Sequence, residues 1–153
     1  MAKKYWLFKS EPNAYSIEDM QKDKKTYWDG VRNYQARNFI RDEMKKGDHV
    51  LFYHSNAKPN AVVGICEIVK EAYPDFTAFD PDNKHFDPKS KTEEPAWYMV
   101  DIKFVKKFTT PVTLEAIKSN TKLKEMRLVQ RGNRLSVFPI EKAEFETIEK
   151  MGV

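Results

Sequence analysis

The segment from Ala61 to Lys70 restricts the possible folds more than any other part of this 153-residue chain. Its residues are apolar almost without interruption, and five of the ten are valine or isoleucine. A short, continuous apolar run of this kind is typical of a strand that is buried on both faces. The chain is therefore expected to form a sheet or barrel around a central strand at 61–70.

Further elements are expected on both sides of this strand. Strand-like stretches rich in aromatic and β-branched residues occur at 5–9, 26–28, 49–54, 96–108 and 135–138. Capping residues and helical periodicity predict helices at 16–22, 33–44, 113–118 and 141–151, with Gly47 at a C-cap position and 122–129 ambiguous. Short strands with helices at the ends of the chain predict a small β-barrel decorated by helices.

Composition supports one globular domain over residues 1–153. The 10 Phe, 7 Tyr and 3 Trp residues are too many for a disordered chain. No apolar run is long enough for a transmembrane helix, and the first residues do not resemble a signal peptide. The single cysteine fits a reducing compartment. We therefore expect a cytoplasmic protein in a bacterium, or a nuclear one in a eukaryote.

Charge and metal-ligand chemistry narrow the function classes. The chain has 27 Lys and Arg against 23 Asp and Glu, a net charge of +4, which is compatible with nucleic acid without requiring it. One cysteine and three scattered histidines make a metal site unexpected, and the aspartates near 80–82 lack the glycine and glutamate of a calcium loop. Because a phosphate-binding glycine loop is also missing, no cofactor is expected.

The stretch from Trp28 to Asn38 is the most informative candidate for binding. Trp28 offers a flat face for stacking, Asn33 has the paired donor and acceptor of an amide, and Arg37 could contact phosphate or a ring. The same pattern also fits a buried tryptophan followed by a salt-bridged helix. The residues alone leave these two interpretations open.

Three other polar stretches lie next to predicted strands. Ser10 and Glu11 end the first strand, where a glutamate could accept a hydrogen bond from a base amino group, or could simply be solvated. His54 and Asn56 end another strand and could line a pocket. Arg131 and Arg134 flank a turn and are weaker candidates for contacts with a nucleic-acid backbone.

Taken in order, these stretches resemble the EVE domain family of the PUA-like superfamily. The resemblance rests on residues 5–12, 28–38, 47–48, 52–56, 63–67, 73–75, 86–89 and 134–137, and it covers nearly the whole chain. Phe138 before Pro139 departs from the glutamine that the family more often has. The resemblance implies an α+β fold, a PUA-like mixed pseudo-β-barrel of about six strands with peripheral helices, which is related to YTH domains.

The resemblance also implies a function and a site. It implies a non-catalytic module that binds DNA or RNA and reads a modified base, for example a methylated one, flipped into a pocket at the barrel mouth. The pocket candidates that it implies are Ser10, Glu11, Trp28, Asn33, Arg37, His54 and Asn56.

Two other functions remain open at this stage. One is an enzyme acting on modified nucleotides or nucleic acid, with Glu11 or Asp29 as acid or base and His54 assisting. The other is a protein-interaction module that uses the proline- and aspartate-rich loop 73–95, which is too long for a simple turn. No membrane partner is expected.

Overall fold

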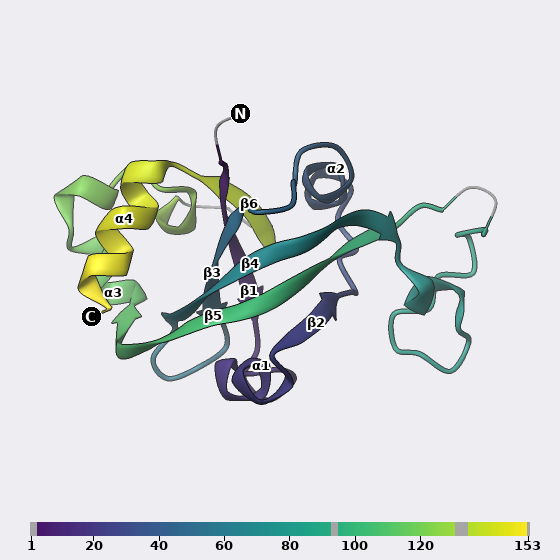
Figure 1. Ribbon diagram of the computed structural model, residues 1–153, viewed down its shortest axis with the longest axis horizontal. Helices are drawn as coiled ribbons and strands as arrows, with labels where there is room; N and C mark the ends of the chain where they lie inside the picture. The colour runs from purple at the N-terminus through teal and green to yellow at the C-terminus, as the bar shows by residue number, and fades with distance from the viewer. Residues whose placement is uncertain (1–2, 93–94, 131–134, 153) are drawn as a thin grey trace.

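The computed structural model describes residues 3–92, 95–130 and 135–152, and its framework is one mixed sheet of six strands (Figure 1). The strand order is β2-β5-β4-β3-β1-β6. β1 and β3 are parallel, and the other neighbouring strands are antiparallel. The strands are β1 (Tyr5–Ser10), β2 (Lys25–Trp28), β3 (His49–His54), β4 (Ala61–Pro74), β5 (Tyr98–Thr113) and β6 (Val137–Ile140).

The sheet curls without closing. β4 and β5 are its longest strands, and their pairing contains several register shifts, which increase the local bend and twist. β2 and β6 are the two edges of the sheet. The predicted α+β pseudo-barrel of about six strands is thus confirmed, as an open and strongly curved sheet, and the predicted strand at 61–70 lies within it as part of β4.

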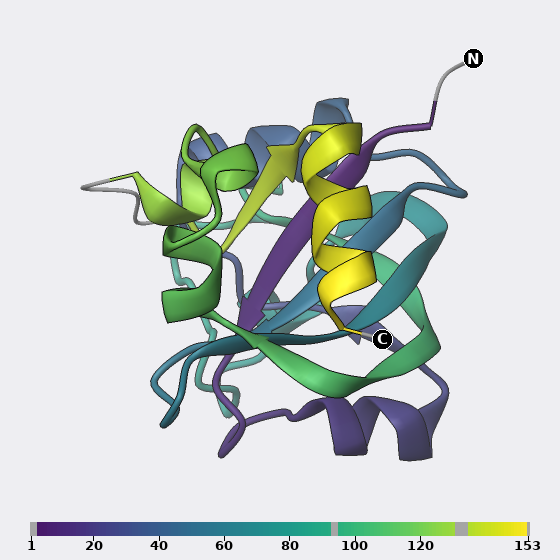
Figure 2. The same cartoon turned by 90° about the vertical axis from the view of Figure 1, so that its left-hand side faces the viewer.

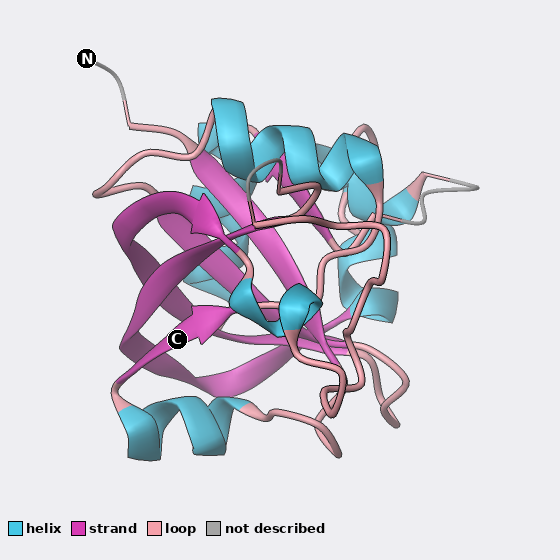
Figure 3. Ribbon diagram, turned by 90° about the vertical axis from the view of Figure 1, so that its right-hand side faces the viewer, coloured by secondary structure: helices cyan, strands magenta, loops and turns pink. Residues whose placement is uncertain are grey.

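Helices surround the curved sheet. The α-helices are α1 (Ile17–Asp23), α2 (Tyr34–Asp42), α3 (Leu114–Lys118) and α4 (Lys142–Met151). The ambiguous stretch 122–129 overlaps two short 3-10 helices, η2 (Thr121–Leu123) and η3 (Arg127–Val129). Figure 2 shows α3 and α4 on one side of the sheet, whereas Figure 3 shows η1 (Phe76–Phe79) and the loop after it on the opposite side. Among the described residues, no helix is long and apolar enough to cross a bilayer.

Local capping explains several helix boundaries. Ser16 forms the predicted capping box with Asp19, and Thr113 caps α3. Gly47 is not the C-cap of α2, because that helix ends at Asp42 with Glu43 as its cap. Gly47 instead has a φ of +95° in the turn before β3, where its N–H donates to the carbonyl of Ile68.

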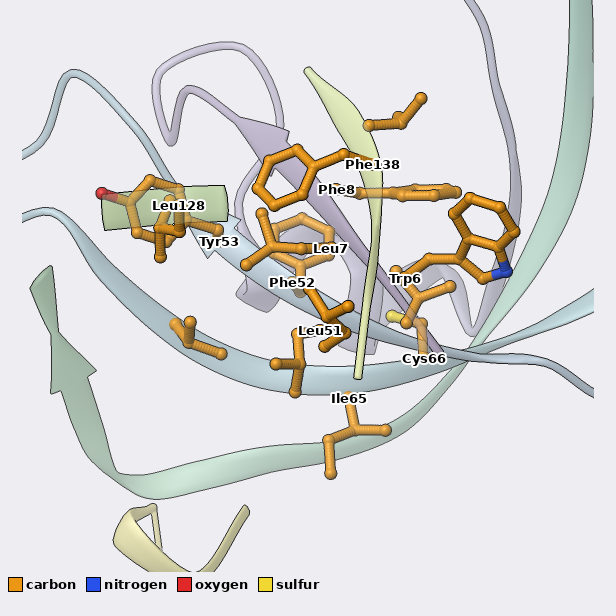
Figure 4. Packing of buried hydrophobic residues seen from close by; sticks show 14 of the residues in the cluster. Trp6, Leu7, Phe8, Leu51, Phe52, Tyr53, Ile65, Cys66, Leu128 and Phe138 are labelled. Carbon is orange, nitrogen blue, oxygen red and sulfur yellow. The ribbon is translucent and has the colours of Figure 1, made fainter. Parts of the chain in front are cut away.

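The hydrophobic core lies inside the curve of the sheet. Trp6, Leu7 and Phe8 on β1 are fully buried, and Figure 4 shows them packed with residues of β3 and β6. The indole N–H of Trp6 donates to buried Asp48 at 3.0 Å, so this polar group is satisfied. Cys66 on β4 is buried, and burial raises the pKa of its thiol to about 12, in agreement with the inert role that its apolar neighbours predict.

Candidate functional site

A cavity of about 890 Å³ opens where β1 and β2 end. Three segments that are distant in sequence form most of its wall. They are the end of β1 with the turn that follows it (9–11 and 14–15), β2 with its following turn (26–31), and part of the long loop between β4 and β5 (83–85). Ser136, just before β6, completes the lining. Three of the seven predicted pocket residues, Ser10, Glu11 and Trp28, are in this lining.

The half-buried indole of Trp28 is the largest ring in this wall. Trp28 is the last residue of β2, and its ring centroid lies 5.1 Å from that of Phe8 and 5.6 Å from that of Phe52. Phe8 and Phe52 are paired across β1 and β3 and are fully buried. The indole is therefore supported from the core while part of it faces the cavity, which is the arrangement that a stacking platform requires.

A carboxylate and a hydroxyl occupy the rim that follows β1. Oε1 of exposed Glu11 accepts a hydrogen bond from Nδ2 of Asn56 at 2.6 Å. Asn56 holds a positive φ of 50°, a conformation that asparagine tolerates better than most residues. The hydroxyl of Ser10 donates to the carbonyl of Tyr15 at 2.5 Å, so its oxygen lone pairs remain available as acceptors. Glu11 and Ser10 line the cavity, whereas Asn56 lies outside the lining and is hydrogen-bonded to Glu11.

The opposite wall combines a turn after β2 with the long loop. Nδ1 of His85 lies 3.3 Å from Oδ2 of Asp29, which joins residues that are 56 positions apart. The imidazole also lies against Gly30, where a β-carbon would approach it to 2.5 Å. Gly30 has a φ of +79°. Both its conformation and its contact with His85 therefore require glycine.

Asp75 anchors the long loop to this turn. Its fully buried carboxylate accepts hydrogen bonds from the Gly30 N–H at 2.8 Å and from Arg32 Nη1 at 3.0 Å. Arg32 also donates to the carbonyl of His85 at 2.6 Å. Burial alone would raise the pKa of the Asp75 carboxyl, but hydrogen bonds from Thr77, Gly30 and Arg32 hold it below its ordinary value. The loop is thus attached by a charged contact that positions His85.

These groups give the cavity a mixed chemistry. Glu11 and Asp29 supply acceptors, and Lys9 and Lys84 supply positive charge. Burial lowers the pKa of the Lys9 ammonium, whose nitrogen lies 5.6 Å from the centre of the Phe138 ring. A flat aromatic face bordered by carboxylates suits a heterocycle with amino groups on its edge. Among the described residues, no cluster of three potential ligands could hold a metal ion.

Four of the predicted pocket residues lie outside the cavity lining and have partners within the protein: Asn33, Arg37, His54 and Asn56. Asn33 caps α2 by accepting from the Ala36 N–H at 3.0 Å. Arg37 donates to the carbonyl of Ala96 at 2.7 Å and packs over the Tyr34 ring. Asn33 and Arg37 are therefore outside the lining of this cavity, and their part in binding stays a prediction.

His54 also lies outside the lining. Its Nε2 accepts from the Ile17 N–H at 3.1 Å, and burial lowers the pKa of its imidazole. It therefore ties the end of β3 to the start of α1 and does not face the cavity. Arg131 and Arg134 lie outside the described residues, so their predicted backbone contacts stay predictions.

Sequence reasoning had missed His85 and Lys84 as lining residues and had considered Asp29 only as an acid or base. The unusual length of loop 73–95 was the one signal that could have indicated the first two. Nothing local distinguishes His85 from an ordinary loop histidine, because its partners Asp29 and Gly30 lie far away in the sequence.

Comparisons with known proteins agree on one family. A model of the EVE domain matches residues 4–151. Thymocyte nuclear protein 1 of Mus musculus is 46% identical over 163 residues, covering 94% of this chain and 71% of that protein. The structure of a hypothetical protein from Leishmania major has a TM-score of 0.93 at 49% identity, covering 99% of this chain and 95% of the other.

A further solved structure contains a ligand. The human THYN1 protein in complex with 5-methylcytosine-containing DNA has a TM-score of 0.90 at 42% identity, covering 98% of each chain.

Proposed function

Because this chain belongs to the EVE domain family, we propose that it is a nucleic-acid-binding module that reads a modified base without catalysis. The observation that carries the proposal is the half-buried Trp28 indole in the wall of an 890 Å³ cavity with carboxylates on its rim. The human relative was crystallised with DNA containing 5-methylcytosine, so this base is the first ligand to test.

The energetics require more than stacking. Extruding a base from a duplex costs a few kcal/mol, whereas stacking on one aromatic ring returns about 1–3 kcal/mol. Hydrogen bonds from rim groups such as Glu11, Asp29 and Ser10 supply the remainder. Cytosine presents an amino group at N4, which a carboxylate can accept.

Selectivity for the modification is expected to be modest. Burial of one extra methyl group contributes only about 0.8 kcal/mol by area. A pocket that recognises a methyl group by contact alone discriminates by about 1–3 kcal/mol, or roughly tenfold to a hundredfold. Larger selectivity would require a hydrogen bond that changes with the modification.

Of the three residues named for the enzyme alternative, Glu11 and Asp29 line the cavity, where Asp29 lies 3.3 Å from His85, whereas His54 does not. His54 is the proposed assisting group, but its Nε2 already accepts from the Ile17 backbone and the residue does not line the cavity. Glu11 is hydrogen-bonded to Asn56 at 2.6 Å. The protein-interaction alternative was based on the length of loop 73–95. Because residues 83–85 of this loop form part of the cavity wall, its length can be explained without a protein partner.

The test is a binding measurement with DNA strands that differ only at one cytosine. Wild-type protein should bind the strand with 5-methylcytosine more tightly than the unmodified strand, and binding should weaken as salt rises. Trp28→Ala should reduce affinity for the modified strand about tenfold. An RNA strand of the same sequence serves to compare the two nucleic acids.

A matched control uses Tyr34→Ala, which removes an exposed ring outside the cavity lining. This variant should keep the preference for the modified strand. Equal affinity of Trp28→Ala and wild-type protein for the modified strand would reject the stacking model.

A further inference from the structure

Two large aromatic side chains are exposed next to each other on the outer face of β2, beside the cavity. Tyr27 on β2 is 43% exposed and Phe76 at the start of η1 is 50% exposed. Their ring centroids lie 5.0 Å apart, with an interplanar angle of 62°. Exposed neighbouring rings of this size are more informative than single exposed apolar residues, because such patches mark binding surfaces.

The fold holds Phe76 outward while it buries polar neighbours. Asp75 and Thr77, which flank Phe76, are 0% and 2% exposed. The Asp75 carboxylate caps η1 through the Thr77 N–H and is attached to Gly30 and Arg32. Burying a carboxylate and a hydroxyl while exposing a phenyl ring reverses the usual preference. Because Asp75 anchors the turn and Thr77 is buried beside it, the ring is presented in a defined position.

Strand alternation gives Tyr27 a similar orientation. Along β2, Thr26 and Trp28 are half-buried and line the cavity, whereas Lys25 and Tyr27 are exposed. Side chains of successive strand residues point to opposite faces. Trp28 and Tyr27 therefore present rings on the two sides of one edge strand, and Tyr27 still contributes to the cavity wall.

Positive charge continues along the same face. Lys25 is directly paired with Lys103 on β5, and like charges placed opposite each other destabilise a sheet. Of the described residues, none forms an ion pair with either lysine. Lys70 lies 4.0 Å from the centre of the Tyr73 ring.

The carboxylates near these lysines have other partners. Asp101, the register partner of Tyr27, accepts a hydrogen bond from the Tyr73 hydroxyl. Glu67, the register partner of Lys103 on β4, lies 4.0 Å from the His49 imidazole. A phosphate backbone near Lys25 and Lys103 would relieve their mutual repulsion.

We propose that Tyr27 and Phe76 form a second stacking platform, which holds a nucleotide flanking the base in the cavity, while Lys25 and Lys103 contact its backbone. The occupant is a single-stranded stretch of nucleic acid that crosses β2, an edge strand of the sheet, from the Trp28 side to the Tyr27 side. This inference rests on the proposed function, since it takes the cavity as the place of the first base. If the inference is correct, the protein binds at least two nucleotides of the strand, one in the cavity and one on the Tyr27 and Phe76 rings.

The test compares a single nucleotide with a strand. The probes are 5-methyldeoxycytidine monophosphate and a short DNA strand with one central 5-methylcytosine. Phe76→Ala, which changes a residue outside the cavity lining, should bind the monophosphate as wild-type protein does and the strand more weakly. The double variant Tyr27→Ala/Phe76→Ala should bind the strand about 5- to 50-fold more weakly. Unchanged strand affinity in this variant would overturn the proposal.

Two further double variants separate stacking from a general loss of structure or apolar area. Tyr27→Phe/Phe76→Tyr keeps both rings and should keep strand affinity, whereas Tyr27→Leu/Phe76→Leu should lose it. Equal strand affinity of the leucine and aromatic variants would contradict a stacking role. Lys25→Gln/Lys103→Gln should reduce the slope of log affinity against log salt by about 1.4, and an unchanged slope would contradict the backbone contact.

The same experiment distinguishes this inference from the proposed function. If wild-type protein binds modified and unmodified strands equally and the alanine double variant weakens both, the platform stands and modified-base reading fails. If the wild-type preference is present and Trp28→Ala removes it, while the alanine double variant binds like wild type, the proposed function stands and the platform fails.

Discussion

The imidazole of His85 lies so close to Gly30 that a β-carbon at residue 30 would sit 2.5 Å from it. This contact brings the loop between β4 and β5 against the turn that follows Trp28, and it forms one wall of the cavity. Gly30 also has a positive φ, and its N–H donates to Asp75. One glycine therefore satisfies a conformational, a steric and a hydrogen-bonding requirement at the same position.

Gly30→Ala should displace His85 and destabilise the protein. Gly47→Ala is the matched control, since Gly47 also has a positive φ but has no atom within 4 Å of a β-carbon placed there. The difference between the two variants isolates the clash with His85, which we expect to be about 1–3 kcal/mol in the free energy of unfolding. Urea denaturation measures it, and equal stabilities would show that the imidazole moves aside without cost.

Asp75→Asn should loosen the long loop. The substitution removes the charge that pairs with Arg32 and weakens the hydrogen bonds that this buried carboxylate accepts. We expect a loss of about 2–4 kcal/mol in the free energy of unfolding, together with faster amide exchange in residues 75–87. Asp80→Asn, at an exposed position of the same loop, should change the free energy of unfolding by less than about 0.5 kcal/mol. A similar stability of both variants would contradict the anchoring role.

Glu11→Gln should weaken binding without weakening the fold. The carboxylate is exposed and lies at the cavity rim, so its loss removes an acceptor for a base amino group while Asn56 can still hydrogen-bond to the amide. We expect about a tenfold loss of affinity for a strand with 5-methylcytosine, measured by fluorescence anisotropy. Glu125→Gln removes an exposed carboxylate outside the cavity lining and should bind as wild-type protein does.

The His54 imidazole should make stability depend on pH. Burial lowers its pKa in the folded protein, and Nε2 accepts from the Ile17 N–H only when that nitrogen is unprotonated. Its contribution is therefore fully present above the unfolded pKa of about 6.5 and is lost as the pH falls through the lower folded pKa. Thermal unfolding between pH 7 and 5 should show a smaller decline for His54→Gln than for wild-type protein.

The comparison variant for His54 is His49→Gln. Burial also lowers the pKa of His49. His49→Gln should therefore lose the part of the pH dependence of stability that comes from His49 and keep the part that comes from His54. Identical pH profiles of His54→Gln and wild-type protein would contradict the assignment. An NMR titration of the two imidazoles checks the direction of each shift directly.

Much of the framework could be predicted because it depends on local patterns. The apolar run at 61–70 lies within β4, and Ser16 forms the expected capping box. Boundaries were less accurate. β6 was expected at 135–138 and runs from Val137 to Ile140, and β5 was expected at 96–108 and runs from Tyr98 to Thr113. The pairing of β6 with β1 and of β5 with β4 decides where these strands begin and end. The sequence of one strand does not show which residues of the neighbouring strand it pairs with.

The candidate site was less predictable than the fold because one residue type can serve two purposes. Asparagine before a helix is typical of an N-cap, and an exposed asparagine amide is also suited to a base edge. Asn33 has the first role. His54 likewise satisfies a backbone N–H and does not face the cavity. Only the position of Ile17, which is 37 residues away, distinguishes the two possibilities.

The sequence by itself determined the family resemblance, the central strand at 61–70 and the candidacy of Trp28, because periodicity, capping and motif order are carried by neighbouring residues. Tertiary structure alone decided that Asp29 and His85 share a wall, and that Tyr27 and Phe76 meet on the outer face. These contacts join residues that are tens of positions apart. Their proximity results from how the sheet curls and from the buried charge that anchors the loop, and neither is encoded in any short stretch of the chain.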